Sequence, residues 1–82
     1  MERKEIENKV IEAASIAYRR PASDISPSTL FVKDLLSKSV NAFRMTMILD
    51  DTFELKIPFE RVIKNQTIAD AIDMVEELLA TK

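Results

Sequence analysis

The stretch FVKDLLSKSVNAFRMTMILDDTF, residues 31–53, decides how the rest of the chain is interpreted. It begins as an irregular segment and becomes amphipathic from about Ser39, which predicts a helix over residues 39–54. A serine at a helix start has two interpretations. Its hydroxyl oxygen commonly accepts a backbone N–H two or three residues on, as an N-cap. Because a helix N-terminus presents free N–H groups and partial positive charge, the same hydroxyl also suits a phosphate ester.

Apolar side chains in this predicted helix form two adjoining stripes, one of Val40, Phe43 and Met47 and one of Met45, Leu49 and Phe53. Together the stripes are wider than a single core contact requires. We therefore expect Val40 and Met47, which lie on the stripe that begins at Ser39, to face a partner rather than the core.

Two features are predicted on the N-terminal side of this stretch. Residues 3–19 carry apolar side chains at helical spacings, and Pro21 ends that helix because its ring disfavours the α conformation of the preceding residue. Residues 22–37 form a long loop, and such loops in compact domains are often functional or held by their own side chains. The expected anchors of the loop are Ile25, Leu30, Phe31, Val32 and Leu35.

On the C-terminal side, a short turn at residues 59–63 follows a break at Pro58, and Thr67 opens the last helix. Thr67 and Asp70 have the spacing of a capping box, although an Asp side chain is short for the reciprocal bond. The chain has no Gly, so any turn that requires positive φ should use Asn or be avoided. The sequence predicts an all-α fold: a small four-helix bundle with three long helices and one short helix, and a long loop between helices one and two.

Composition excludes several classes of function. The 82 residues are expected to form one domain, residues 1–82, and the net charge of -2 with no clustered basic face argues against nucleic-acid binding. The absence of Cys and His removes thiolate chemistry, the usual metal ligands and the commonest general base. No apolar run approaches the roughly 20 residues that span a bilayer, and the charged N-terminus is unlike a signal peptide. We expect a cytoplasmic monomer.

Three groups of residues carry a family resemblance, in one register without a gap: Asp34, Leu35 and Ser39; Leu49, Asp50, Asp51 and Phe53; and Ile57 and Pro58. In these positions the chain resembles the acyl carrier protein family. The last helix, from Thr67 onward, is also similar to that of the family. The resemblance covers residues 3–79, and the ungapped spacing makes it specific.

The resemblance implies that Ser39 Oγ is joined by a phosphodiester to 4′-phosphopantetheine, which a phosphopantetheinyl transferase takes from coenzyme A. The terminal thiol of this arm would carry an acyl group as a thioester, so the chain would be a carrier and not an enzyme. Its partners would be acyl-transferring and acyl-modifying enzymes of fatty acid, other lipid, polyketide or peptide pathways. The family also implies an acyl pocket between the helices, lined by Phe31, Met45, Leu49, Val62, Ile68 and Ala71.

The chain departs from the family pattern around the serine. Residues 38–40 are KSV where the family usually has Asp-Ser-Leu, Leu36 replaces a common Gly, and Asn41 and Arg44 replace acidic residues. Lys38 and Arg44 would repel the basic patches of ordinary partner enzymes, which favours dedicated partners in a specialised pathway. The alternative is that both are solvated residues with no effect. The predicted docking surface comprises Lys38, Val40, Asn41, Arg44, Met47 and Ile57.

Other interpretations also stay open. Met45 and Met74 could line the pocket or simply fill the core. Acidic pairs at residues 50–51 and 76–77 could attract cations, but adjacent carboxylates on a helix point apart, so no metal site is predicted. The competing function is a non-catalytic interaction module with unmodified Ser39, whose apolar stripe binds partner helices. No nucleophile–base pair or Gly-rich phosphate cradle exists, so no catalytic residue is predicted.

Overall fold

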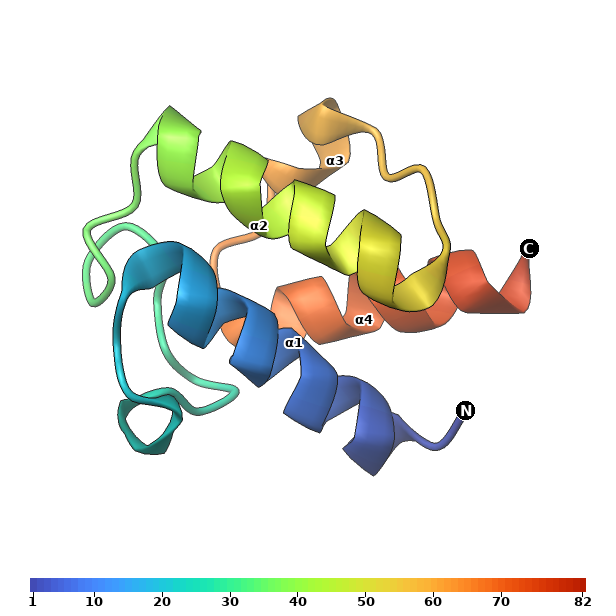
Figure 1. Cartoon of the computed structure of the whole chain (residues 1–82), viewed down its shortest axis with the longest axis horizontal. Coiled ribbons are helices and arrows are strands. Elements are labelled where there is room, and N and C mark those ends of the chain that lie inside the picture. Colours follow the sequence, from blue (N-terminus) through green and yellow to red (C-terminus); the bar gives the residue numbers. More distant parts are fainter.

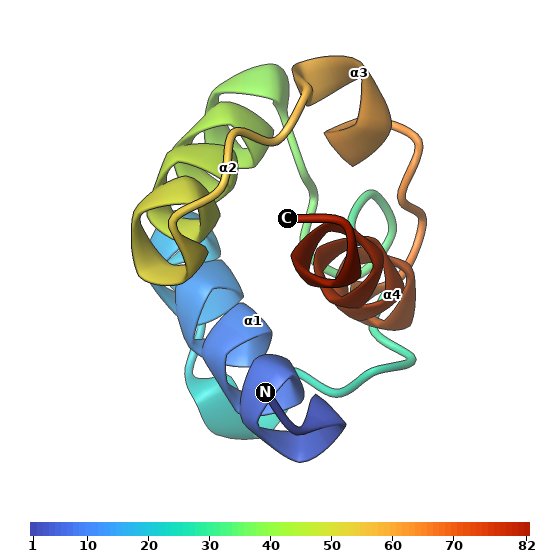
Figure 2. The ribbon, with the colours of Figure 1, turned by 90° about the vertical axis from the view of Figure 1, so that its right-hand side faces the viewer.

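The computed structural model describes all 82 residues, which form helices joined by loops (Figure 1). The long helices α1 and α4 pack against each other, and α1 also packs against α2. Figure 2 shows α4 facing α1 and α2 across the core. The predicted all-α bundle of three long helices and one short helix is confirmed. Its elements are α1 (Arg3–Tyr18), the 3₁₀ turn η1 (Ala22–Asp24), α2 (Ser39–Phe53), α3 (Phe59–Val62) and α4 (Ile68–Ala80).

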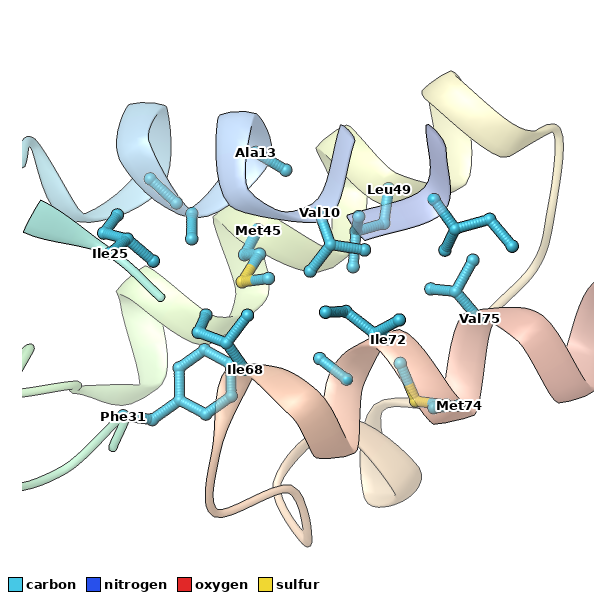
Figure 3. Packing of buried hydrophobic residues seen from close by; sticks show 14 of the residues in the cluster. Val10, Ala13, Ile25, Phe31, Met45, Leu49, Ile68, Ile72, Met74 and Val75 are labelled. Carbon is cyan, nitrogen blue, oxygen red and sulfur yellow. The ribbon is translucent and has the colours of Figure 1, made fainter. Parts of the chain in front are cut away.

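The core is built from one buried face of each long helix, as the apolar periodicity predicts. Figure 3 shows Val10 of α1, Met45 of α2 and Ile72 of α4 pointing into the same space. Each large apolar side chain buried there stabilises the fold by roughly 1.5–3 kcal/mol. The fully buried large side chains are Ile6, Val10, Met45, Leu49, Ile68, Ile72 and Val75.

Three residues adopt the left-handed conformation, and none of them is Asn. Arg19 (φ 55°) and Glu54 (φ 55°) end α1 and α2, where their N–H groups donate to the carbonyls of Ser15 and Asp50. Leu36 (φ 54°) lies in the loop before α2. The expectation that a chain without Gly would use Asn at such positions, or avoid them, is wrong. Helix termination and loop closure require this conformation, although it costs a residue with a Cβ atom about 1–2 kcal/mol.

The loop between α1 and α2 is tied to the start of α4. Leu30 and Thr67 form an isolated antiparallel bridge, and the Phe31 N–H donates to the Gln66 carbonyl at 3.0 Å. These bonds satisfy backbone groups that a long loop would otherwise expose. The loop that leads to Ser39 is therefore held by the tertiary fold.

The buried side chains of this loop agree with prediction at most positions. Ile25, Phe31 and Leu35 are buried and Leu30 is half-buried, as expected of anchors. Val32 is 75% exposed, so its predicted role as an anchor is wrong. Residues 31–35 form a tight turn in which the Leu35 N–H donates to the Leu30 carbonyl. In such a turn Phe31 and Leu35 share one face, and Val32 points away from it.

The start of α4 is capped reciprocally. Thr67 Oγ1 accepts the N–H of Asp70 at 3.1 Å, and Asp70 Oδ2 accepts the N–H of Thr67 at 3.1 Å. Asp70 Oδ2 also accepts the N–H of Gln66 at 3.0 Å. The Asp side chain is therefore long enough to complete the capping box, contrary to expectation, and it fixes the end of the loop that meets Leu30.

Replacing Asp70 by Asn should lower the free energy of unfolding more at about pH 7 than at about pH 2. The N–H groups of Gln66 and then Thr67 lower the pKa of Asp70 below its ordinary value. Because this pKa is lower in the folded state, the stabilisation is present above the unfolded pKa and is lost as the pH falls through the folded pKa. Urea unfolding at the two pH values measures the difference. Asp24→Asn, at an exposed carboxylate of η1, is the control, and an equal pH dependence in both variants would contradict the assignment.

Replacing Leu36 by Gly should raise the free energy of unfolding by about 0.5–1 kcal/mol, because the relief of left-handed strain exceeds the added entropy of the unfolded chain. Leu36 is 66% exposed, so the substitution removes little packing. Leu36→Ala keeps the Cβ atom and should give no comparable gain. Urea unfolding of both variants measures the effect, and equal gains would show that the exposed Leu side chain, not φ, is responsible.

Candidate functional site

Ser39 is the first residue of α2, not the residue that caps it. The N-cap position belongs to Lys38, whose backbone is extended (φ −119°, ψ 165°). Ser39 is exposed, and its Oγ makes no hydrogen bond within the chain, because the capping bonds of this terminus come from another side chain. The Ser39 hydroxyl is therefore free for chemistry.

Asn41 organises the start of α2. Its Oδ1 accepts the N–H of Lys38 at 3.1 Å, and its Nδ2 donates to the carbonyl of Ala17 near the end of α1 at 3.2 Å. One side chain thus caps α2 and ties it to a residue 24 positions earlier. The N–H groups of Ser39 and Val40 have no acceptor in the chain, so they leave the partial positive charge of the helix terminus beside the hydroxyl.

The Asp-Leu pair ahead of the serine shapes the approach to it. Asp34 Oδ2 accepts the N–H of Leu30 at 2.8 Å, which closes the turn over residues 31–35. Leu35 is buried and anchors that turn. Further along the chain, the Ser37 N–H donates to the Phe31 carbonyl at 2.9 Å. This sequence of bonds brings the chain to Ser39 in a defined direction.

An apolar cavity of about 170 Å³ opens beside Ser39, enclosed by α2, α3, α4, the end of α1, the loop before α2 and the segment after α3. Ten of its fourteen lining residues are hydrophobic. One of the six residues predicted for an acyl pocket, Ile68, is fully buried and does not line the cavity. Figure 3 shows Phe31, Met45 and Leu49 within the packed core. The predicted pocket residues that line the cavity together with Ser39 are Phe31, Met45, Leu49, Val62 and Ala71.

Sequence reasoning missed several lining residues. These residues come from three separate stretches of the chain and meet only in the folded state: Tyr18 from α1, Val32 and Ser37 from the loop before α2, and Ile63 and Asn65 from the segment after α3. No local spacing could have grouped them. Met74, for which pocket lining and core filling were both open, is buried and also lines the cavity.

The second apolar stripe of α2 lies on the outside of the bundle. Val40, Phe43 and Met47 are 70%, 55% and 53% exposed, whereas the other stripe is buried. The ring of Phe43 meets that of Phe59 edge to face at 5.9 Å between centroids. The width of the apolar pattern is thus explained by one stripe in the core and one on the surface.

The charges beside this stripe are positive. Lys38 and Arg44 are exposed, and neither takes part in a salt bridge. The acidic residues of α2 stand at its far end, where Asp50 Oδ1 accepts the N–H of Ile57 at 2.9 Å. The exposed surface near Ser39 therefore combines apolar side chains with unpaired cations.

Two predicted docking residues are engaged inside the fold. Ile57 is 6% exposed and belongs to the core, because the bond from its N–H to Asp50 holds the loop after α2 against the bundle. Asn41 is half-buried, and its side chain serves the helix cap. The exposed members of the predicted set are Lys38, Val40, Arg44 and Met47.

The acidic pairs have separate roles. Glu76 pairs with Arg3 at 3.0 Å and Glu77 with Arg61 at 3.1 Å, so the two carboxylates have different partners. The structure contains no group of three or more acidic, His or Cys side chains that could hold a metal ion. No helix has the length and apolar character needed to cross a membrane.

The chain is similar in sequence to a known protein over most of its length. No family model matches the chain. A curated relative, the acyl carrier protein of Rubrobacter xylanophilus, is 31% identical over 77 residues, which cover 94% of this chain and 95% of the relative. A similarity of that extent includes the loop, α2 and the cavity-forming helices together.

Proposed function

This chain belongs to the acyl carrier protein family, and we propose that it carries acyl intermediates as thioesters on a 4′-phosphopantetheine arm attached to Ser39. The observation that carries this proposal is the unbonded Ser39 hydroxyl at the first position of α2, beside an apolar cavity. Members of the family are carriers rather than catalysts. The residues of this chain would hold the arm and its cargo, while partner enzymes perform the reactions.

The residues around Ser39 suit a phosphodiester. The free N–H groups of Ser39 and Val40 point from a helix terminus, where an anion is stabilised by about 0.3–1 kcal/mol. Lys38, the adjacent residue, has no carboxylate partner and adds a positive charge. No side chain would have to move to free the hydroxyl.

Attachment of the arm is a group transfer from coenzyme A. Ser39 Oγ would form a bond to the phosphorus of the arm, and the pyrophosphate bond of coenzyme A would break and release adenosine 3′,5′-bisphosphate. The hydroxyl proton would leave to a base of the transferase, because Ser39 Oγ donates to no acceptor in this chain. The thiol that the arm supplies accounts for a carrier without Cys.

The cavity suits the apolar part of an acyl cargo. Its lining is mostly hydrophobic, so it excludes water from a hydrocarbon chain and shields the thioester near it. A cavity of about 150 Å³ accommodates benzene, so the space here corresponds to roughly six carbon atoms. Met45 and Met74 give its wall adaptable side chains.

The exposed stripe of Val40 and Met47, flanked by Lys38 and Arg44, would be the surface that partner enzymes recognise. Apolar contacts would supply affinity, and the cations would favour partners with acidic rims and repel those with basic rims. This charge pattern supports a specialised lipid or secondary-metabolite pathway with dedicated partners. We further propose that the carrier acts as a cytoplasmic monomer.

Intact-mass spectrometry of protein from its own host, or after incubation with coenzyme A and a cognate transferase, should show the mass of one added phosphopantetheine group. The Ser39→Ala variant should gain no mass under the same conditions. Ser23→Ala, which removes another exposed hydroxyl in η1, should be modified like the parent.

An unmodified parent chain, even with a cognate transferase, would exclude the carrier function. The outward apolar stripe would then favour the competing function, a helical interaction module. Modification of Ser39→Ala would instead mean that a different hydroxyl carries the arm.

The double variant Lys38→Asp, Arg44→Glu should be modified and acylated by enzymes of ordinary acyl carriers about tenfold faster than the parent. The gain should diminish at high salt, because exposed charges are screened. Steady-state rates at two salt concentrations measure both effects. Lys4→Asp, Lys56→Glu, an equal charge change away from the start of α2, is the matched control. Equal rates for the parent and the first variant would remove the electrostatic basis for dedicated partners.

A further inference from the structure

One polar pair stands out within the apolar cavity. Tyr18, at the end of α1, and Ser37, two residues before Ser39, both line the space. The Tyr18 hydroxyl lies 2.7 Å from Ser37 Oγ, and either oxygen can be the donor. The Tyr18 ring also lies 5.9 Å from that of Phe31, so the phenol is held by packing as well as by this bond.

The Tyr18–Ser37 pair has one more O–H hydrogen than the bond between the two hydroxyls uses. Two hydroxyl groups carry two O–H hydrogens, but the bond between them uses only one. Neither Tyr18 Oη nor Ser37 Oγ makes another hydrogen bond in the chain. One O–H donor is therefore left without a partner in the chain, and because Ser37 is half-buried, water can reach it. A cargo that displaces water from this mainly hydrophobic cavity leaves the donor unused, at a cost in free energy, unless the cargo offers an acceptor.

The leftover donor is available at neutral pH. Tyr18 is only 8% exposed, and burial raises the pKa of its phenol, which keeps the proton in place. The bond between the two hydroxyls also polarises the remaining O–H group and strengthens its bond to an acceptor. Asn65, the one side-chain amide in the lining, already donates from its Nδ2 to Met74 Sδ at 3.5 Å.

We propose that the Tyr18–Ser37 pair donates a hydrogen bond to an oxygen on the acyl cargo, so that this cavity selects acyl chains with an oxo or hydroxyl group over fully reduced chains. The inference rests on the proposed carrier function, because the cargo reaches the cavity only from an arm on Ser39. Acyl chains that bear an oxo or hydroxyl group are a class of cargo that an apolar lining alone would disfavour. An oxygen-bearing chain satisfies the donor, whereas a reduced chain leaves it unsatisfied.

The test compares hexanoyl, 3-oxohexanoyl and 5-oxohexanoyl groups loaded onto the full chain from the corresponding coenzyme A thioesters. The rate of acyl transfer to added N-acetylcysteamine, a thiol that cleaves the thioester and leaves the oxo groups intact, reports how well each cargo is sheltered. Each rate is divided by that of the free pantetheine thioester, which removes the intrinsic reactivity of the acyl group. We expect at least one oxo chain to be sheltered about fivefold more than hexanoyl, the ratio that one hydrogen bond typically gives.

The double variant Tyr18→Phe, Ser37→Ala removes both hydroxyls but keeps the aromatic ring, and it should abolish this preference. Each single variant retains one hydroxyl in a less fixed position and should reduce the preference in part. Ser23→Ala, outside the cavity, should leave it unchanged. Urea unfolding of every variant checks that the fold is retained.

The outcomes separate this inference from the proposed function. If the chain loads but shelters oxo and reduced chains equally, or if the double variant keeps the preference, the inference is overturned and the carrier function stands. If Ser39 accepts no arm from any coenzyme A thioester with a cognate transferase, both fall together.

Discussion

Burial of Met45, Leu49 and Phe53 fixes the rotation of α2 about its axis, and the candidate site depends on that rotation. With this stripe in the core, the stripe of Val40, Phe43 and Met47 must face outward. The position of α2 along its axis is set separately by Asn41, which bonds both the Lys38 N–H and the Ala17 carbonyl. Together these contacts determine where the Ser39 hydroxyl stands relative to the cavity.

The positions of the helices could be predicted from the sequence because apolar residues at helical spacing mark the face of a helix that is buried. The predicted helices agree with α1, α2 and α4 to within about two residues, the usual uncertainty of helix ends. Ser39 and most of the proposed pocket were found through the register of a family resemblance. Ile68 fell outside the cavity because depth in a core cannot be told from a spacing alone.

The features that sequence could not supply depend on contacts between distant residues or on backbone conformation. The Asn41–Ala17 bond and the Tyr18–Ser37 pair join residues 24 and 19 positions apart, and no local pattern connects them. The fold imposes the left-handed conformation on three residues whose intrinsic backbone preference is against it: Arg19, Leu36 and Glu54. Ile57 was expected on the docking surface, whereas its side chain packs in the core and its N–H donates to Asp50.

The bridge between Leu30 and Thr67 has a consequence for local motion. A segment that shares backbone hydrogen bonds with a helix start cannot detach without fraying that helix, so the two form one cooperative unit. Phe31 belongs to this segment and Ala71 to the first turns of α4, and both line the cavity. The loop wall and the α4 wall of the cavity are thus mechanically linked, so widening the cavity toward the loop requires partial melting of α4. The helix α3 has only four residues and shares no such bridge, so it can move alone.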